Sequence, residues 1–273
     1  MSHVDIRIPI MAAVALVTGP VLFWRGFRHI RVCRLIENTP TARIRSMAMG
    51  LVELNGKVEA RSDLIAPFSG KRCAHWQVQI AVRGKRKGSW TVVHRNHSGN
   101  PFFLQDDTGI AMVFPEGSDC RIRFGTDEEC SGFNLPEVYA DYVRENPGAL
   151  NALNRYGWLR FRERTLEDGM QVYILGTATP RSRAIVVSEG EALAATGTDD
   201  LGGRQRNERD HAASAVVRQG ENESTFIISQ ESERDIVFGL KTKAVAMIWG
   251  GPLLGLLGLA YWLYVLVMGH WLR

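Results

Sequence analysis

Thiol and imidazole side chains gather in one short stretch, as Cys73-x-His75 and His94-x-x-His97. Both groups bind zinc, and a basic turn at 84–88 predicts a hairpin that would bring His94 towards the first pair. A zinc site needs three or four converging ligands held by a supporting shell. Ordinary strand residues explain the pattern better, so we predict no metal ligand and no cofactor.

Adjacent carboxylates occur at Asp106-Asp107 and Glu128-Glu129. Paired carboxylates serve general acid–base catalysis, but neighbouring residues on a strand point to opposite faces. Turn chemistry and solvation account for both pairs. The sequence has no P-loop, no G-x-G-x-x-G and no Ser/His/Asp order, so we predict no catalytic and no cofactor-binding residue.

A basic turn with an aromatic neighbour is the remaining chemical motif, formed by Arg83, Lys85, Arg86, Lys87 and Trp90. Phosphate contact combined with base stacking is how OB-type surfaces hold single-stranded nucleic acid. A solvated hairpin tip, or one that leans on anionic lipid, explains the same residues. The net charge of +4 is modest, and nucleic acid is disfavoured as a partner.

Two apolar runs must position everything else. Residues 244–272 contain no Asp, Glu, Lys or Arg, and Ile8–Trp24 is a second, shorter run. About 20 apolar residues cross a bilayer as a helix. The first run lacks the basic start and small-residue cleavage site of a signal peptide. We predict a multi-pass membrane protein with transmembrane helices at 8–24 and 244–267, and no domain after Arg273.

Basic residues fix the predicted orientation. Six arginines follow the first run and two lysines precede the second: Arg25, Arg28, Arg31, Arg34, Arg43, Arg45, Lys241 and Lys243. The positive-inside rule therefore places the central region in the cytoplasm. The four cysteines (Cys33, Cys73, Cys120 and Cys130) show no framework spacing, which favours reduced thiols, although a Cys120–Cys130 bridge stays open.

The central region, 36–235, reads as mainly β structure. We expect a helix over 135–146 with Val138, Tyr142 and Val143 near one face, and a flexible loop over about 191–215. The expected strands cover 47–60, with a bend at Gly56, and then 73–82, 89–94, 101–115 as a hairpin turning at 107–109, 120–124, 157–166, 170–180, 185–187 and 225–229.

One residue spacing occurs twice in the chain and indicates the architecture. Residues 52–58 and 172–178 share the spacing V-x-[LI]-x-G-x-[VA]. A strand that bends at a glycine suits the first strand of an OB-type barrel. We therefore predict a membrane-anchored α+β protein, in which two transmembrane helices flank a mainly antiparallel, OB-like β-barrel domain of one or two units.

Three stretches in the same order resemble the GIDE/BAM-domain family, the family of MULAN-like mitochondrial E3 ubiquitin ligases. Residues 101–113 are similar to its apolar hairpin. Residues 162–176, with Glu163, Leu166, Gly169, Val172 and Gly176, are similar to its E-x-x-L-x-x-G-x-x-V/L-x-x-x-G strand pair. Residues 226–229, followed by a polar helix and the last apolar run, match its closing strand and second membrane helix.

The resemblance implies ubiquitin transfer, which in the family's ligases depends on a RING domain after the second span. A RING binds zinc through spaced pairs of Cys and His. This chain has four cysteines and no CxxC, so it resembles a RING-less member. We predict a non-catalytic sensing, scaffold or partner-binding module; E3 ubiquitin-protein transfer and single-stranded nucleic-acid binding are the alternatives. In the family the domain lies on the non-cytosolic side, against the orientation predicted above.

Glycines in the last run bear on assembly. Gly251-x-x-x-Gly255 lets a second helix approach closely, either the first span or a copy of this chain. A homo-oligomer through the second span therefore joins the lipid bilayer and an unidentified protein in the predicted partners.

Overall fold

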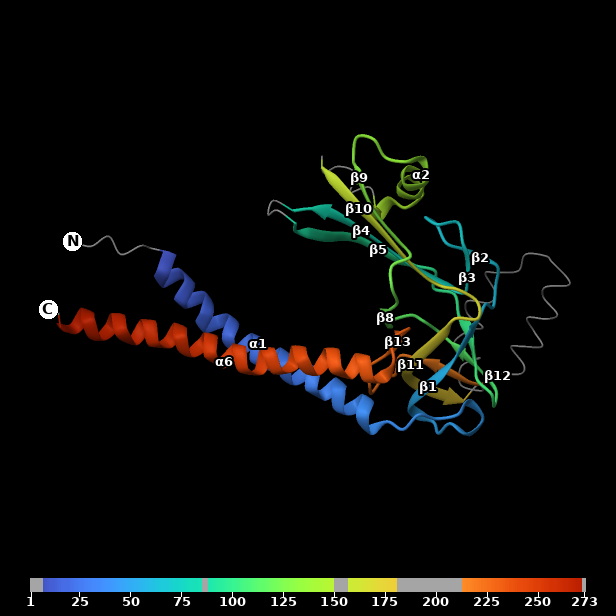
Figure 1. Cartoon of the computed structure of the whole chain (residues 1–273), viewed down its shortest axis with the longest axis horizontal. Helices are drawn as coiled ribbons and strands as arrows, with labels where there is room; N and C mark the ends of the chain where they lie inside the picture. The colour runs from blue at the N-terminus through green and yellow to red at the C-terminus, as the bar shows by residue number, and fades with distance from the viewer. Residues whose placement is uncertain (1–6, 85–87, 150–156, 181–212, 272–273) are drawn as a thin grey trace. The chain divides into compact units, whose positions relative to one another are not determined.

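The computed structural model describes residues 7–84, 88–149, 157–180 and 213–271. The chain forms two compact units (Figure 1). One contains residues 1–39 and 232–273, and the other contains residues 40–231. The fold is α+β, with a helical unit formed by the two ends of the chain and a central domain rich in strands.

The helical unit is a pair of long helices, α1 (Arg7–Asn38) and α6 (Glu233–Trp271). Glycines line their contact: a Cβ atom added to Gly19 would lie 2.7 Å from the carbonyl oxygen of Gly251, and one added to Gly258 would lie 2.7 Å from that of Ala12. The pair is antiparallel, because Ala12 of α1 meets Gly258 of α6, whereas Gly19, later in α1, meets Gly251, earlier in α6. Gly251 thus lies against the backbone of α1, while a Cβ at Gly255 would meet nothing within 4 Å in the described chain.

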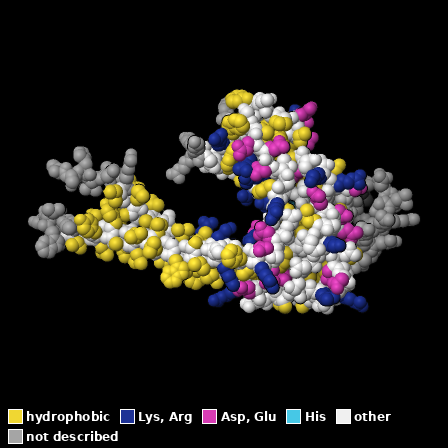
Figure 2. Space-filling model, in the orientation of Figure 1, with side chains coloured by type: hydrophobic (Ala, Val, Ile, Leu, Met, Phe, Trp, Pro, Cys, Tyr) yellow, Lys and Arg dark blue, Asp and Glu magenta, His cyan; other side chains and the backbone are white. Residues whose placement is uncertain are grey.

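The outward surface of this pair is apolar. Trp24 and Trp249 are 70% and 76% exposed, and the visible side of both helices is mostly hydrophobic (Figure 2). Both helices are long and apolar enough to cross a membrane, and only 11% of each apolar window is buried. Soluble monomers rarely expose apolar patches of more than a few hundred Å². Both helices also extend beyond the predicted spans, α1 by continuing through the arginine-rich segment to Asn38.

The central domain is built on a five-stranded mixed β-barrel. The barrel follows the order β1-β6-β7-β12-β11, and β11 pairs again with β1 to close it. Four neighbouring pairs are antiparallel, whereas β12 and β7 are parallel, so the barrel is mixed. Its strands are β1 (Gly50–Glu59), β6 (Phe102–Gln105), β7 (Ile110–Val113), β11 (Gln171–Pro180) and β12 (Ala213–Arg218).

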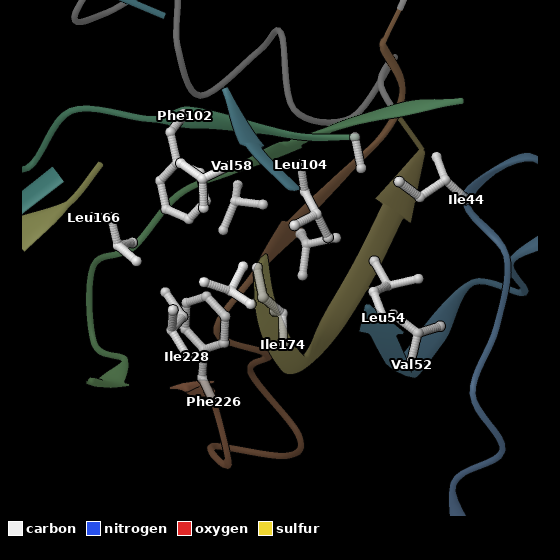
Figure 3. Close-up of a cluster of buried hydrophobic side chains, with 14 of the residues drawn as sticks. Ile44, Val52, Leu54, Val58, Phe102, Leu104, Leu166, Ile174, Phe226 and Ile228 are labelled. Atoms are coloured by element: carbon white, nitrogen blue, oxygen red, sulfur yellow. The ribbon is translucent and has the colours of Figure 1, made fainter. Parts of the chain in front are cut away.

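The barrel encloses an apolar core in which Phe102, Leu104 and Ile174 are fully buried (Figure 3). The two segments with the shared spacing, 52–58 and 172–178, are antiparallel partners, with Val52 opposite Gly176 and Gly56 opposite Val172. A Cβ at Gly56 would lie 2.6 Å from the carbonyl oxygen of Gln105, and one at Gly176 would lie 2.9 Å from the Phe226 ring. The predicted glycine bend is therefore a place where only glycine fits.

A second, four-stranded antiparallel sheet has the order β5-β4-β10-β9. Two segments inserted between barrel strands supply it, one between β1 and β6 and the other between β7 and β11. Helix α2 (Glu137–Glu145) packs on one face (Figure 1), through a core that includes Val78, Phe161, Tyr139, Tyr142 and Val143. The strands are β4 (His75–Arg83), β5 (Trp90–His97), β9 (Thr126–Ser131) and β10 (Trp158–Leu166).

Smaller elements complete the domain, and the hairpin over 101–115 forms as predicted. Strand β12 begins at Ala213, inside the segment predicted to be a loop; residues 191–212 and the predicted strand 185–187 lie outside the described residues. In α2, Val138 is exposed and Tyr139 takes the expected buried place. The remaining elements are η1 (Ile44–Ser46), β2 (Leu64–Ile65), β3 (Arg72–Cys73), β8 (Asp119–Arg121) and β13 (Ile227–Ser229).

Candidate interaction face

The face of the second sheet opposite α2 is strongly cationic. Phe161 and Leu159 of β10 point into the α2 core, so the alternating residues of β10 point the other way. These are three arginines, and cross-strand register adds residues from the other strands to the same face. We call this surface the arginine face: Trp90, Arg95 and His97 of β5, Gln77, Gln79 and Arg83 of β4, Arg160, Arg162 and Arg164 of β10, and Asp127 and Glu129 of β9.

One end of the arginine face is neutralised by ion pairs. Arg160 donates two hydrogen bonds to Asp127, at 2.5 and 2.7 Å, and lies 3.8 Å from Glu129. Arg162 donates to the same Asp127 at 3.2 Å. These bonds lower the pKa of the Asp127 carboxyl, chiefly through Arg160. Trp90 lies beside this end, with the Arg160 guanidinium 5.7 Å from its ring centre.

The other end is held between the strands and an aromatic ring. The guanidinium groups of Arg162 and Arg164 lie 4.9 and 4.0 Å from the centre of the Phe124 ring, within the range of cation–π attraction. Arg164 also donates to the carbonyl oxygen of Cys120. Burial lowers the pKa of Arg164, and the charges of Arg162 and Arg95 lower it further. A half-buried guanidinium here faces two others of like charge.

The cysteine and histidine residues do not assemble into a site. His94 lies on the α2 side, 3.2 Å from the Tyr142 hydroxyl, whereas His75 bonds to Ser98 at 2.7 Å and lies beside His97. Among the described residues, no group of three or more His, Cys, Asp or Glu could hold a metal. All four cysteines are free thiols, so the Cys120–Cys130 bridge is absent. Burial raises the pKa of Cys73 to about 11 and that of Cys120 to about 12.

The carboxylate pairs are structural. Asp106 closes the β6–β7 turn: its Oδ1 accepts from the N–H groups of Thr108 and Gly109, and its Oδ2 accepts from that of Ile44. Glu128 and Glu129 lie on β9 and point to opposite faces, as adjacent strand residues must. The first accepts from the Tyr139 hydroxyl at 2.8 Å and the second faces Arg160.

The motif over 162–176 also has a structural account. Glu163 is 1% exposed, and its two oxygens accept from the N–H groups of Phe68 and Ser69 at 2.7 and 2.9 Å. Gly169 has a φ of +77° in the turn between β10 and β11. These two strands belong to different sheets and do not pair with each other. The pattern therefore marks a crossing from one sheet to the other, and Leu166 and Val172 lie in the barrel core.

Three residues of the predicted basic turn, Lys85, Arg86 and Lys87, lie outside the described residues. Arg83 and Trp90 are opposite each other at its base. Sequence reasoning missed the arginine face as a unit. The signal was present in the alternation of residues 158–164, WLRFRER, but the neighbours of that strand come from distant segments.

No family model, curated protein or solved structure matches the chain.

Proposed function

We propose that this protein is a membrane-anchored binding module that recognises an anionic partner through the arginine face and performs no catalysis of its own. The observation that carries the proposal is a sheet with one face packed on α2 and the other lined by five arginines. Asp127 and Glu129 neutralise one end of this face, and clustered arginines favour recognition of carboxylate or phosphate groups.

The membrane anchor is supported by the helical unit. Exposed apolar residues cover both helices, and glycines bring the two backbones together as in membrane helix pairs. Four arginines of α1 and two lysines of α6 lie at one end of the pair, and the positive-inside rule then puts the central domain in the cytoplasm. Protease applied from outside to cells stripped of their wall should leave the central domain intact; cleavage within it would reverse the orientation.

The barrel supports the finer fold proposal. Numbered along the chain, its strands follow the order 1-2-3-5-4 and close from 4 to 1, with strands 3 and 5 parallel. This is the arrangement of a five-stranded OB barrel. The GIDE/BAM resemblance remains a proposal of the same kind, supported by the order of its three stretches along this chain.

A partner-capture experiment tests the binding function. The full chain in native membranes is crosslinked and purified as wild type, as the double variant Arg95→Glu, Arg162→Glu, and as Arg144→Glu. Arg144 is an exposed arginine on α2 and serves as the matched control. We expect the same specific protein from wild type and control and its loss from the double variant. Equal recovery from all three would refute binding through this face.

E3 ubiquitin transfer is the enzymatic alternative, supported by the family resemblance. Purified full chain is incubated with ubiquitin, activating enzyme and conjugating enzymes, and its zinc content is measured in parallel. Autoubiquitylation by a zinc-bearing sample would overturn the non-catalytic proposal. We expect neither.

Single-stranded nucleic acid is a second candidate, favoured by one observation. The insertion between the first and second barrel strands carries the basic turn, and in OB barrels the loop at this position contributes to oligonucleotide binding. Its test is binding of a labelled oligonucleotide to the full chain across a salt series. Affinity that falls steeply with salt would support it, and absence of binding at low salt would remove it.

A further inference from the structure

The two ends of the arginine face differ in charge balance, and the difference points to a ligand. At the β9 end, Asp127 and Glu129 face Arg160 and Arg162. At the β5 end, Arg95 stands opposite Gln79, and Gln79 stands opposite Arg162. Gln77, one pair along, stands between His97 and Arg164. This second half combines arginine and glutamine donors across three strands, and one carboxylate, Asp127 of β9, stands opposite Arg162.

Two buried polar atoms in this half lack hydrogen bonds. Within the described part of the chain, Arg164 Nε and Gln77 Oε1 are buried and have no partner. They belong to residues directly opposite each other on β10 and β4. Buried polar groups are nearly always bonded, and an unpaired group costs free energy. Arg164 Nε is a donor that lacks an acceptor, which an anion would supply; Gln77 Oε1 is an acceptor, and a half-turn of the amide would put an N–H₂ donor in its place.

Neighbouring carboxylates offset these charges only in part: Asp127 accepts a hydrogen bond from Arg162, and the charge of Asp119 acts on Arg164. Asp119 of β8 is the carboxylate nearest in sequence to Cys120, whose carbonyl accepts from Arg164, but it pairs with Arg121 at 2.8 Å. Arg95 is exposed on the edge strand β5. Strands lie about 4.8 Å apart, so the backbones of β5 and β10 are separated by about 10 Å across β4. Long arginine side chains from both strands can therefore converge on one anion above the glutamines.

We propose that Arg95, Arg162 and Arg164, together with the amides of Gln77 and Gln79, bind a phosphate group. Guanidinium forks match the oxygens of phosphate in paired hydrogen bonds, and the glutamine amides supply neutral donors beneath them. The group is either free phosphate or the phosphomonoester of a lipid headgroup such as phosphatidic acid. This assignment rests on the proposed function, because it names the ligand chemistry of the same face.

The test uses the full chain in phosphatidylcholine nanodiscs. One arm titrates sodium phosphate against a sodium chloride blank of equal ionic strength, with binding read by calorimetry. The second arm captures, on the immobilised chain, soluble lipid vesicles with and without phosphatidic acid. Saturable binding in the first arm assigns free phosphate as a ligand. Capture that depends on phosphatidic acid, without the first signal, assigns the lipid headgroup.

Variants locate the site. Arg95→Gln and Arg164→Gln should each weaken binding about tenfold or more, which corresponds to about 1.4 kcal/mol. Arg144→Gln on α2 should bind as wild type. Arg95 is exposed, so its variant remains informative if Arg164→Gln fails to fold. Absence of binding in both arms, or wild-type binding by Arg95→Gln, would overturn the phosphate site. If phosphate binding is absent but partner capture is intact, the phosphate site is wrong and the proposed function is retained, with carboxylate groups as the ligand.

Discussion

In the barrel, strand pairing encloses a core, whereas in the second sheet it leaves one face free. In the barrel, side chains that point inward meet one another, and every strand has a neighbour on both sides. In the second sheet, one face packs on α2 while the other carries Arg95, Arg160, Arg162 and Arg164. A closed barrel has no unpaired strand edge, and its interior is filled by side chains, so it offers little surface to a ligand. The inserted sheet has a free face, so binding and stability can lie in different parts of one domain.

The largest effect should come from the barrel core. Phe102 is fully buried, and Phe102→Ala leaves a cavity beside Leu104 and Ile174. We expect a loss of about 3–5 kcal/mol in the free energy of unfolding, measured by urea denaturation of the full chain in nanodiscs. Phe133→Ala, the same change at a side chain that is 79% exposed, should stay within about 0.5 kcal/mol. Equal costs would mean that the barrel is not the stable part.

The next effect concerns pH and the buried His75, which lies where the second sheet meets the barrel. Burial lowers the pKa of His75 from 6.5 to about 4. The unfolded chain therefore binds a proton that the folded chain excludes. The free energy of unfolding should fall as the pH drops from about 6.5 to about 4, by up to ~1.4 kcal/mol per pH unit. The His75→Gln variant should lose this part of the slope; an unchanged slope would contradict the account.

A smaller loss is expected at the sheet crossing. Glu163→Gln keeps the shape but replaces one carboxylate oxygen by an N–H₂ group, which cannot accept from Phe68 or Ser69. We expect a cost of about 1–3 kcal/mol and faster hydrogen exchange at the amides of Phe68 and Ser69. Glu167→Gln, at a half-buried neighbour paired with Lys71, is the matched control. Unaltered exchange at both amides would show that Glu163 does not hold this turn.

The smallest effect on stability should come from the arginine face itself. Arg95→Gln removes a charge from an exposed edge position and should change the free energy of unfolding by less than about 0.5 kcal/mol. Chemical denaturation under the same conditions checks this. A cost approaching that of Phe102→Ala would mean that the face is structural, and the contrast between barrel and sheet would fail.

Local chemistry explains which parts of the fold could be predicted. The hairpin over 101–115 was predictable because an Asp-Thr-Gly turn separates two apolar runs. The close backbone approach at Gly56 fits a glycine inside a strand, while the predicted bend there stays a prediction. Strand β12 was not predictable: ASAVVR is short, follows a charged segment, and is stabilised by a parallel partner about a hundred residues earlier in the chain.

The sequence predicts only parts of the arginine face. The alternation of arginine with apolar residues along β10 predicts a strand with one cationic face, but not that Arg95 and Gln79 lie beside it. Cross-strand register depends on long-range pairing, and here two separate insertions meet. His94, His75 and Asp106 were visible as motifs, but hydrogen bonds to Tyr142, Ser98 and Ile44 from other parts of the chain give them structural roles.

The separation of binding from stability is tested most directly by one paired measurement on the double variant Arg95→Glu, Arg162→Glu. Partner recovery is measured by crosslinking in native membranes and the unfolding midpoint is measured in nanodiscs, with wild type and Arg144→Glu alongside in both. The account predicts lost recovery at a midpoint close to that of wild type and control. Recovery that survives the charge reversal, or a midpoint that falls together with it, would contradict the account.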